Sequence, residues 1–172
     1  MTGRTEHWPR AARVACESMD LKTTSARALR NACKRFLQDL QALPEDAFSR
    51  SLGGTSRTVA DIVHEVNLVN DDVGRVIRGE EPFEWPDEKW IKAPADFDTK
   101  DVVVGASEKS SGRIIDTIEA LSDEAFEATI KTEQGETTRF ERCRFVTLHL
   151  AYHSGQLNFI QTLLGDDGLH WN

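Results

Sequence analysis

The chain has 172 residues, of which 39% are hydrophobic and 29% are charged, and its formal net charge is −8 at pH 7. These values predict one soluble domain over residues 1–172 with a sizeable core. The acidic balance argues against nucleic-acid and anionic-membrane partners, which usually require a basic patch. No apolar run approaches the roughly 18 residues that span a bilayer. Because the first residues also lack an apolar signal core, we expect a cytoplasmic protein.

Apolar residues at spacings of three and four predict the first two long helices. The first is expected over residues 21–43, with a short helix near residues 9–19 before it. The second is expected over residues 59–78, because Thr58 can cap its N-terminus and Gly79 follows its last turn.

Residues 80–98 form a long connection that contains three prolines. A connection of this length is uncommon in a compact domain unless it has a specific role. Its aromatic residues Phe83, Trp85 and Trp90 are expected first to anchor the connection and second to line a pocket over a functional site.

Two further helices are expected over residues 99–121 and 141–164. The first of these has the weaker pattern because Gly105 and Gly112 lower its helix propensity. Residues 129–140 are expected to contain a small β-hairpin.

Two similar hexads follow the first and third of these helices, at residues 43–48 and 121–126. Each reads Leu, a variable residue, two acidic residues, Ala and Phe. This similarity indicates an internal repeat of a helix–loop–helix unit. The predicted fold is therefore all-α: an up-down-up-down antiparallel four-helix bundle with a small hairpin before the last helix, in which the second and fourth helices are equivalent.

Three cysteines, Cys16, Cys33 and Cys143, are widely spaced and form no C-x-x-C motif. Their odd number argues against a disulfide framework and fits a reducing compartment. We expect each to be a small buried residue rather than a catalytic thiol.

Three histidines are the candidate functional residues. His149 and His153 are four residues apart, so both rings project from one face of the fourth predicted helix. His64 lies in the second predicted helix and would face them if the two helices are equivalent. Three imidazoles in this arrangement can bind one metal ion and leave positions open for water or substrate.

A purely structural bundle with buried histidines is the alternative, because a single histidine on an apolar helix face is more often a core residue than a ligand. Buried ring nitrogens need partners, since an unsatisfied buried polar group is costly. A metal ion would satisfy three of them at once. The chain has no H-E-x-x-H motif, so a zincin protease is not indicated.

Two motifs carry a resemblance to a known family: the capped run at residues 58–64, which ends in His64, and the H-x-x-x-H-x-G-Q signature at residues 149–156. With their spacing, they resemble the DinB/YfiT-like superfamily of metal-binding four-helix bundles. The resemblance covers roughly residues 20–165.

This resemblance implies a divalent metal site formed by His64, His149 and His153. Zinc ranks first because open three-histidine sites suit its Lewis-acid chemistry, and nickel, iron and copper also accept such ligands. The resemblance also implies a homodimer. Some members are similar to thiol S-transferases or isomerases that use bacillithiol or mycothiol, and others have been regarded as hydrolases.

Other side chains near the histidines have two interpretations each. Asp61 is expected either to orient His64 or to stabilise the first helical turn. Gln156 is expected to bond a ligand or substrate, or to be a core amide. Tyr152 is expected to donate to substrate, or to pack at an interface. Glu65 points about 100° away from His64 and is therefore expected to be a poor general base.

The first functional hypothesis is a metal-dependent enzyme that acts on a small molecule, either thiol S-transferase-like, with a low-molecular-weight thiol as cofactor, or hydrolase-like. The metal would bind a thiolate directly or lower the pKa of a bound water to about 7. The alternative is a non-catalytic metal-binding protein related to stress.

Overall fold

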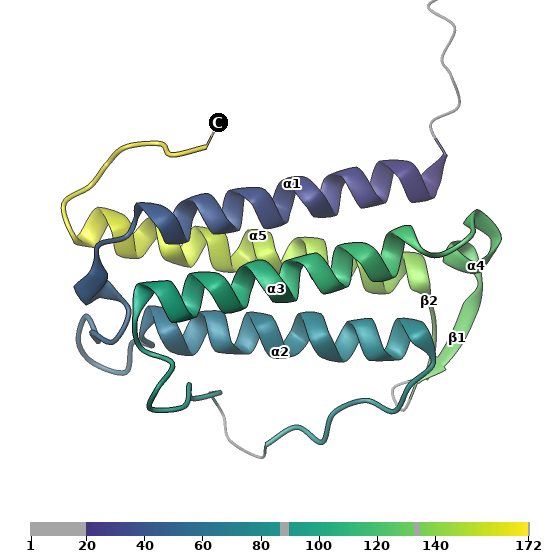
Figure 1. The fold of residues 1–172 in the computed structure, drawn as a ribbon, viewed down its shortest axis with the longest axis horizontal. Helices are drawn as coiled ribbons and strands as arrows, with labels where there is room; N and C mark the ends of the chain where they lie inside the picture. Colours follow the sequence, from purple (N-terminus) through teal and green to yellow (C-terminus); the bar gives the residue numbers. More distant parts are fainter. Residues whose placement is uncertain (1–19, 87–89, 133–134, 172) are drawn as a thin grey trace, which may run out of the picture.

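The computed structural model describes residues 20–86, 90–132 and 135–171. Within them, long helices pack side by side as a bundle (Figure 1): α1 (Leu21–Ala42), α2 (Val59–Arg78), α3 (Lys100–Glu119) and α5 (Arg139–Leu163). The shorter elements are the 3-10 helix η1 (Glu45–Ala47), α4 (Asp123–Glu127) and the antiparallel hairpin of β1 (Thr129–Thr132) and β2 (Gly135–Thr138). The all-α bundle with a hairpin before its last helix is confirmed. The short helix expected at residues 9–19 lies outside the described residues, as does Cys16.

The long helices do not alternate in direction. At the start of α3, the Lys100 ammonium donates to the Leu43 carbonyl just after α1, at 2.7 Å. Helix α3 therefore starts at the end of the bundle where α1 finishes and α2 begins, and α2 and α3 run parallel (Figure 1). Helix α5 is antiparallel to α2, because Arg139 at its start donates to the Ile77 carbonyl near the end of α2, at 2.8 Å. The order is up-down-down-up.

This order corrects the alternating directions that the sequence analysis expected. Alternation requires short connections between successive helices, but the connection between α2 and α3, described over residues 79–86 and 90–99, returns along α2 (Figure 1). Helix α2 has 20 residues and is about 30 Å long, a distance that this connection can span because extended chain covers about 3.3 Å per residue. The connection is hydrogen-bonded to α2 along the way, from the Phe83 N–H to Asp72 and from the Ala93 N–H to Asp61. Its unusual length is needed because it carries the chain back to the end of the bundle at which α2 begins.

Each long helix packs against two others: α1 and α2 each lie between α3 and α5 and are diagonal to one another. Their apolar faces meet in one core. Its fully buried side chains include Leu29, Phe36, Leu40, Val63, Val66, Ile114, Ile118, Val146, Leu150 and Leu157. Burying one such side chain stabilises the fold by about 1.5–3 kcal/mol.

The two hexads have similar structures. Each forms a short helical segment, η1 in the first and α4 in the second, and each buries its phenylalanine completely, Phe48 and Phe126. η1 follows α1 and α4 follows α3, and each closes the end of the bundle at which that long helix finishes. The similarity in sequence therefore corresponds to a similarity in local structure.

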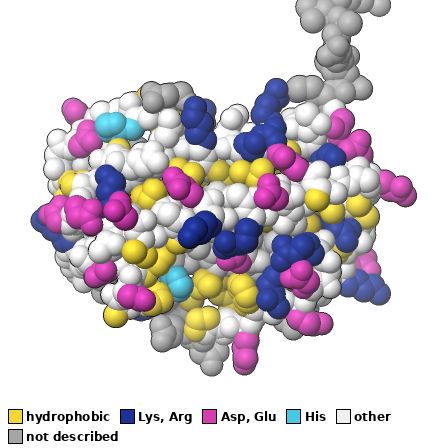
Figure 2. Space-filling model, in the orientation of Figure 1, with side chains coloured by type: hydrophobic (Ala, Val, Ile, Leu, Met, Phe, Trp, Pro, Cys, Tyr) yellow, Lys and Arg dark blue, Asp and Glu magenta, His cyan; other side chains and the backbone are white. Residues whose placement is uncertain are grey.

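The two cysteines in the described residues are small buried side chains, as the sequence predicts. Cys33 and Cys143 are buried free thiols, and burial raises the pKa of each to about 11. None of the helices in the described ranges is long and apolar enough to cross a membrane. On the face drawn in Figure 2, acidic and basic side chains are interspersed over the helices.

Candidate metal centre

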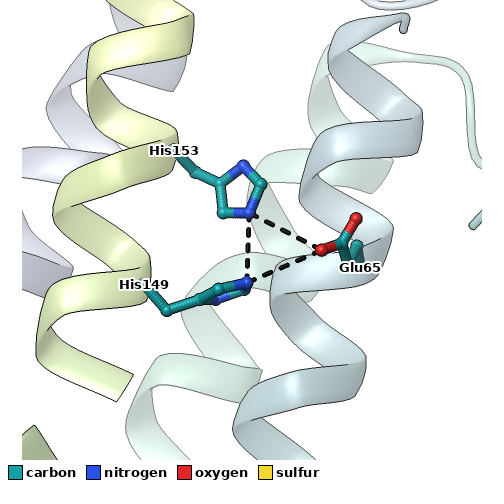
Figure 3. A group of neighbouring side chains, drawn as sticks. All are labelled: Glu65, His149 and His153. Carbon is teal, nitrogen blue, oxygen red and sulfur yellow. Dashed lines mark hydrogen bonds and ion pairs between the residues drawn. The ribbon is translucent and has the colours of Figure 1, made fainter. Parts of the chain in front are cut away.

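Three possible ligand atoms meet between α2 and α5 (Figure 3). The Nε2 atoms of His149 and His153 are 3.1 Å apart. Glu65 Oε1 reaches them from α2, at 3.6 Å from His149 Nε2 and 3.7 Å from His153 Nε2. Among the described residues, this is the group of histidine, cysteine and acidic side chains whose ligand atoms converge closely enough to hold one metal ion.

The spacing of these atoms suits a single ion. Zinc binds histidine nitrogen and carboxylate oxygen at about 2.0–2.2 Å, so two ligand atoms of a tetrahedral site lie about 3.3 Å apart. The three separations, from 3.1 to 3.7 Å, lie close to that value. Two imidazoles and one carboxylate are a ligand set known from catalytic zinc sites and from non-haem iron sites, in which further positions stay open.

The hydrogen bonds around His153 prepare its Nε2 as a ligand. His153 Nδ1 lies 2.8 Å from Gln156 Oε1, and an amide oxygen can only accept, so Nδ1 carries the proton. In the neutral ring, Nε2 then presents a lone pair to the centre. The Gln156 amide is itself oriented, because its Nε2 donates to the Tyr152 hydroxyl at 3.1 Å. Metal-bound histidines are commonly fixed in this way through their second nitrogen.

His149 is less completely satisfied. Its Nδ1 is buried and has no hydrogen-bond partner within the described parts of the chain, and its ring stacks on Phe145 with centroids 5.8 Å apart. Its Nε2 faces only His153 Nε2 and Glu65 Oε1. A cation at the centre would satisfy the lone pairs of both imidazoles, so the donor set fits a metal ion.

Arg57 holds the carboxylate of Glu65. Its guanidinium lies 2.6 Å from Glu65 Oε2 and also donates to the Asp61 carbonyl at 2.7 Å. The Trp90 ring lies against the guanidinium, 5.6 Å from ring centre to Cζ. Arg57 therefore occupies one carboxylate oxygen and leaves Oε1 for the centre. The neighbouring imidazoles of His149 and then His153, together with Arg57, hold the pKa of Glu65 far below its usual range.

His64 is not part of this cluster. The structure places it against the crossover connection, where its ring packs on Phe97 with centroids 5.5 Å apart. Burial lowers the pKa of His64, against a smaller opposing effect of Asp61. Successive residues of a helix point about 100° apart, so His64 and Glu65 cannot both face α5. The structure brings Glu65, His149 and His153 together and leaves His64 outside this group, and metal binding by either set stays a prediction.

Asp61 serves the connection and the helix start. It accepts from the Lys92 ammonium at 2.8 Å and from the Ala93 N–H at 2.9 Å, and it forms a capping box with Thr58. Burial works against its charge, but these donors outweigh it, and the pKa of Asp61 lies below its usual value. Its interpretation as a first-turn residue describes these contacts better than an orienting role for His64.

Sequence reasoning missed Glu65 and Arg57. The sequence predicts Glu65 to be a poor general base because it points away from His64, yet its direction is the one that faces α5. The pairing of α2 with α5 indicates Glu65. The two helices are antiparallel and Ile77 lies opposite Arg139, so Glu65 lies opposite the turn between His149 and His153.

A comparison with family models matches nearly the whole bundle. The model described as the DinB superfamily matches residues 6–157. A comparison with curated proteins found no match.

Three solved structures are similar in fold. The mycothiol-dependent maleylpyruvate isomerase has 15% sequence identity and a TM-score of 0.65, over 79% of this chain and 60% of that protein. A conserved protein from Enterococcus faecalis has 14% identity and a TM-score of 0.66, over 87% of this chain and 100% of that one. A DinB-like protein from Bacillus subtilis has 12% identity and a TM-score of 0.58, over 85% and 95%. The chain thus spans about three fifths of the isomerase, and the likeness at these identities is one of fold.

Proposed function

Because the chain belongs to the DinB superfamily, we propose that it is a metal-dependent enzyme in which Glu65, His149 and His153 hold one divalent ion. The convergence of two imidazole nitrogens and one carboxylate oxygen between α2 and α5 carries this proposal. Zinc is the first candidate because its coordination distances suit the three separations, and iron and nickel accept the same ligands.

When bound, the ion would act as a Lewis acid that activates a coordinated water or thiolate. The surrounding residues would control what reaches it. Arg57 keeps Glu65 in one orientation, and Gln156 keeps the Nδ1 proton on His153. Since the Tyr152 hydroxyl accepts from Gln156, its own proton is available to a substrate at the surface of the site.

Two reaction classes fit such a site: thiol S-transfer or a related isomerisation, and hydrolysis. The structural neighbour named a mycothiol-dependent isomerase supports the first, because it shares this fold. A low-molecular-weight thiol would then be the cosubstrate, and a small electrophile would be the substrate. Hydrolysis needs no more than an activated water and is the second choice.

We also propose a homodimer. The solvent side of α5 exposes several large apolar side chains, among them Leu148, Phe159 and Leu163, each more than half exposed. Such a face is typical of an interface. Light scattering should give twice the mass of the chain, and a monomer over the micromolar range would contradict the proposal.

The first experiment measures metal content. Protein purified without a histidine tag should bind about one equivalent of zinc or nickel, and His149→Ala should bind far less. His170→Ala is the matched control, because His170 pairs with Asp166 away from the site. A wild-type protein that refuses both metals would exclude the proposal.

The second experiment measures turnover. The loaded protein is incubated with a low-molecular-weight thiol and a model electrophile, or with an activated ester. Wild type should exceed His149→Ala, and the reaction that shows the difference assigns the class. Equal rates in both assays would remove the enzymatic proposal and favour a non-catalytic metal-binding protein.

A further inference from the structure

A second feature is a pocket formed by α2, α5, β1 and the crossover connection, about two helical turns from the candidate metal centre. It is a pocket of about 340 Å³, within the size range of small-molecule sites. Val76 from α2 and Phe83 and Trp85 from the crossover connection supply apolar surface, while Lys131 from β1 and Arg142 from α5 supply positive charge.

Helix geometry connects this pocket with the metal centre. Arg142 and His149 are seven residues apart on α5, which is two turns on one face and about 10 Å. Glu65 and Asp72, which also lines the pocket, have the same separation on α2. The Phe145 ring bridges the interval, because it stacks on His149 and lies under the Arg142 guanidinium, 5.6 Å from Cζ. The two sites are therefore neighbours on the same faces of α2 and α5, two helical turns apart.

The positive charges of the pocket have no ion-pair partner in the described part of the chain. Within the described residues, neither Arg142 nor Lys131 lies in an ion pair, and the buried Nε of Arg142 has no hydrogen-bond partner.

Of the three acidic residues that line the pocket, one is paired with a cation among the described residues. Asp72 accepts the Phe83 N–H at 2.8 Å, and Glu80 pairs with Arg78 at 2.6 Å, while Glu81 is exposed. An unpaired arginine in a chain with a net charge of −8 is suited to an anionic ligand, because guanidinium binds carboxylate and phosphate in a two-pronged geometry.

We propose that this pocket binds the acidic end of an organic anion whose other end reaches the metal centre, with Arg142 and Lys131 as the anion-binding residues. The ligand would be a carboxylic acid with an apolar body about 10 Å long, a length set by two helical turns. The apolar body would lie against Phe145 and the aromatic residues of the connection. This inference rests on the proposed function for the metal end only, since the anion-binding end is independent of any ion.

In the first test, calorimetry measures the binding of octanoate to the metal-free protein. Arg142→Gln should weaken binding about ten- to hundredfold, as expected for the loss of a charge-assisted hydrogen bond, and Arg142→Lys should lose less. Arg144→Gln is the matched control, because Arg144 is exposed on the same helix and does not line the pocket. Lys131→Gln supplies a second variant if Arg142→Gln does not fold. Octanoate that binds wild type and Arg142→Gln equally, or that does not bind wild type, overturns the proposal.

The second test uses zinc-loaded protein and thiols of two lengths. Wild type should bind 8-mercaptooctanoate at least tenfold more tightly than uncharged 8-mercaptooctanol, and Arg142→Gln should lose this preference. The shorter 3-mercaptopropanoate cannot reach from Arg142 to the metal centre, so it should bind both proteins equally. Equal affinity of wild type for the long acid and the long alcohol overturns the proposal. Failure to load either zinc or nickel would refute the proposed function, whereas octanoate binding that depends on Arg142 would still support the anion site.

Discussion

Substitution of Glu65 distinguishes two possible ligand sets. In one, Glu65 binds the metal with His149 and His153, and in the other, His64 takes the place of Glu65. Glu65→Gln keeps the shape of the side chain but removes the negative charge of the ligand, and His64→Gln is the matched change at the neighbouring position. If Glu65 is a ligand, its variant should lose most of the metal affinity while the His64 variant keeps it.

The expected loss of zinc affinity can be worked out from the binding free energy per ligand. Structural zinc sites with four ligands bind with about 10–16 kcal/mol, which is about 2.5–4 kcal/mol per ligand, or roughly 10²–10³-fold in affinity. The lower end is expected for Glu65→Gln, because the amide oxygen remains a weak ligand. Arg57 would lose its carboxylate partner but would keep its bond to the Asp61 carbonyl and its contact with Trp90.

The assay is a competitive zinc titration against a chromophoric chelator, with circular dichroism to verify that both variants are folded. A loss of affinity in His64→Gln, with full affinity in Glu65→Gln, would refute the centre described here and restore the three-histidine set. A loss in neither variant would show that the metal binds elsewhere.

Further predictions concern the support of the centre, its pH dependence and the core. Gln156→Leu removes the acceptor that fixes the His153 tautomer and should weaken metal binding about 10–100-fold in the same titration. Metal affinity should fall in acid, because protons compete with the metal ion for the ligand atoms; equal affinity at pH 7 and pH 5 would contradict this. Burial raises the pKa of Asp39 above its unfolded value, so its contribution to stability is present in acid and lost as the pH rises through the folded pKa. Asp39→Asn should therefore unfold at a higher urea concentration than wild type at pH 7, but not at pH 3.5. A larger gain in stability at pH 3.5 than at pH 7 would be evidence against a buried charge at Asp39. Phe48→Ala and Phe126→Ala should each lower the free energy of unfolding by about 3–5 kcal/mol, and a change below about 1 kcal/mol in either would show that its hexad does not close the core.

Much of the fold could be predicted because local signals set the helix ends. The capping box of Thr58 and Asp61 and the left-handed Gly79, with φ of 78°, bound α2 at the residues that the sequence indicated. Helix α5 starts earlier than expected, at Arg139, because Thr138 and Glu141 form a second capping box. That signature is present in the sequence and would have given the correct start.

Two features could not be read from local patterns. The direction of α3 depends on where the crossover connection ends. The hydrogen bonds that hold the connection to α2, among them those of the Phe83 and Ala93 N–H groups, follow no periodicity in the sequence. The choice between His64 and Glu65 depends on the rotation of α2 relative to α5, which packing of the whole core decides. A spacing rule applied to α5 was sufficient for His149 and His153, since both lie on one element.

The up-down-down-up order also has a consequence for biosynthesis. Helix α1 packs against α5, which is synthesised after it, and roughly 120 residues separate their ends, which takes about 6–24 s of translation at 5–20 residues per second. During that interval the apolar face of α1 lacks its native neighbour, and so does α2, whose Glu65 has no histidine partner yet. A nascent chain stalled before residue 139 should therefore recruit chaperones, and the centre can form only once α5 has been synthesised.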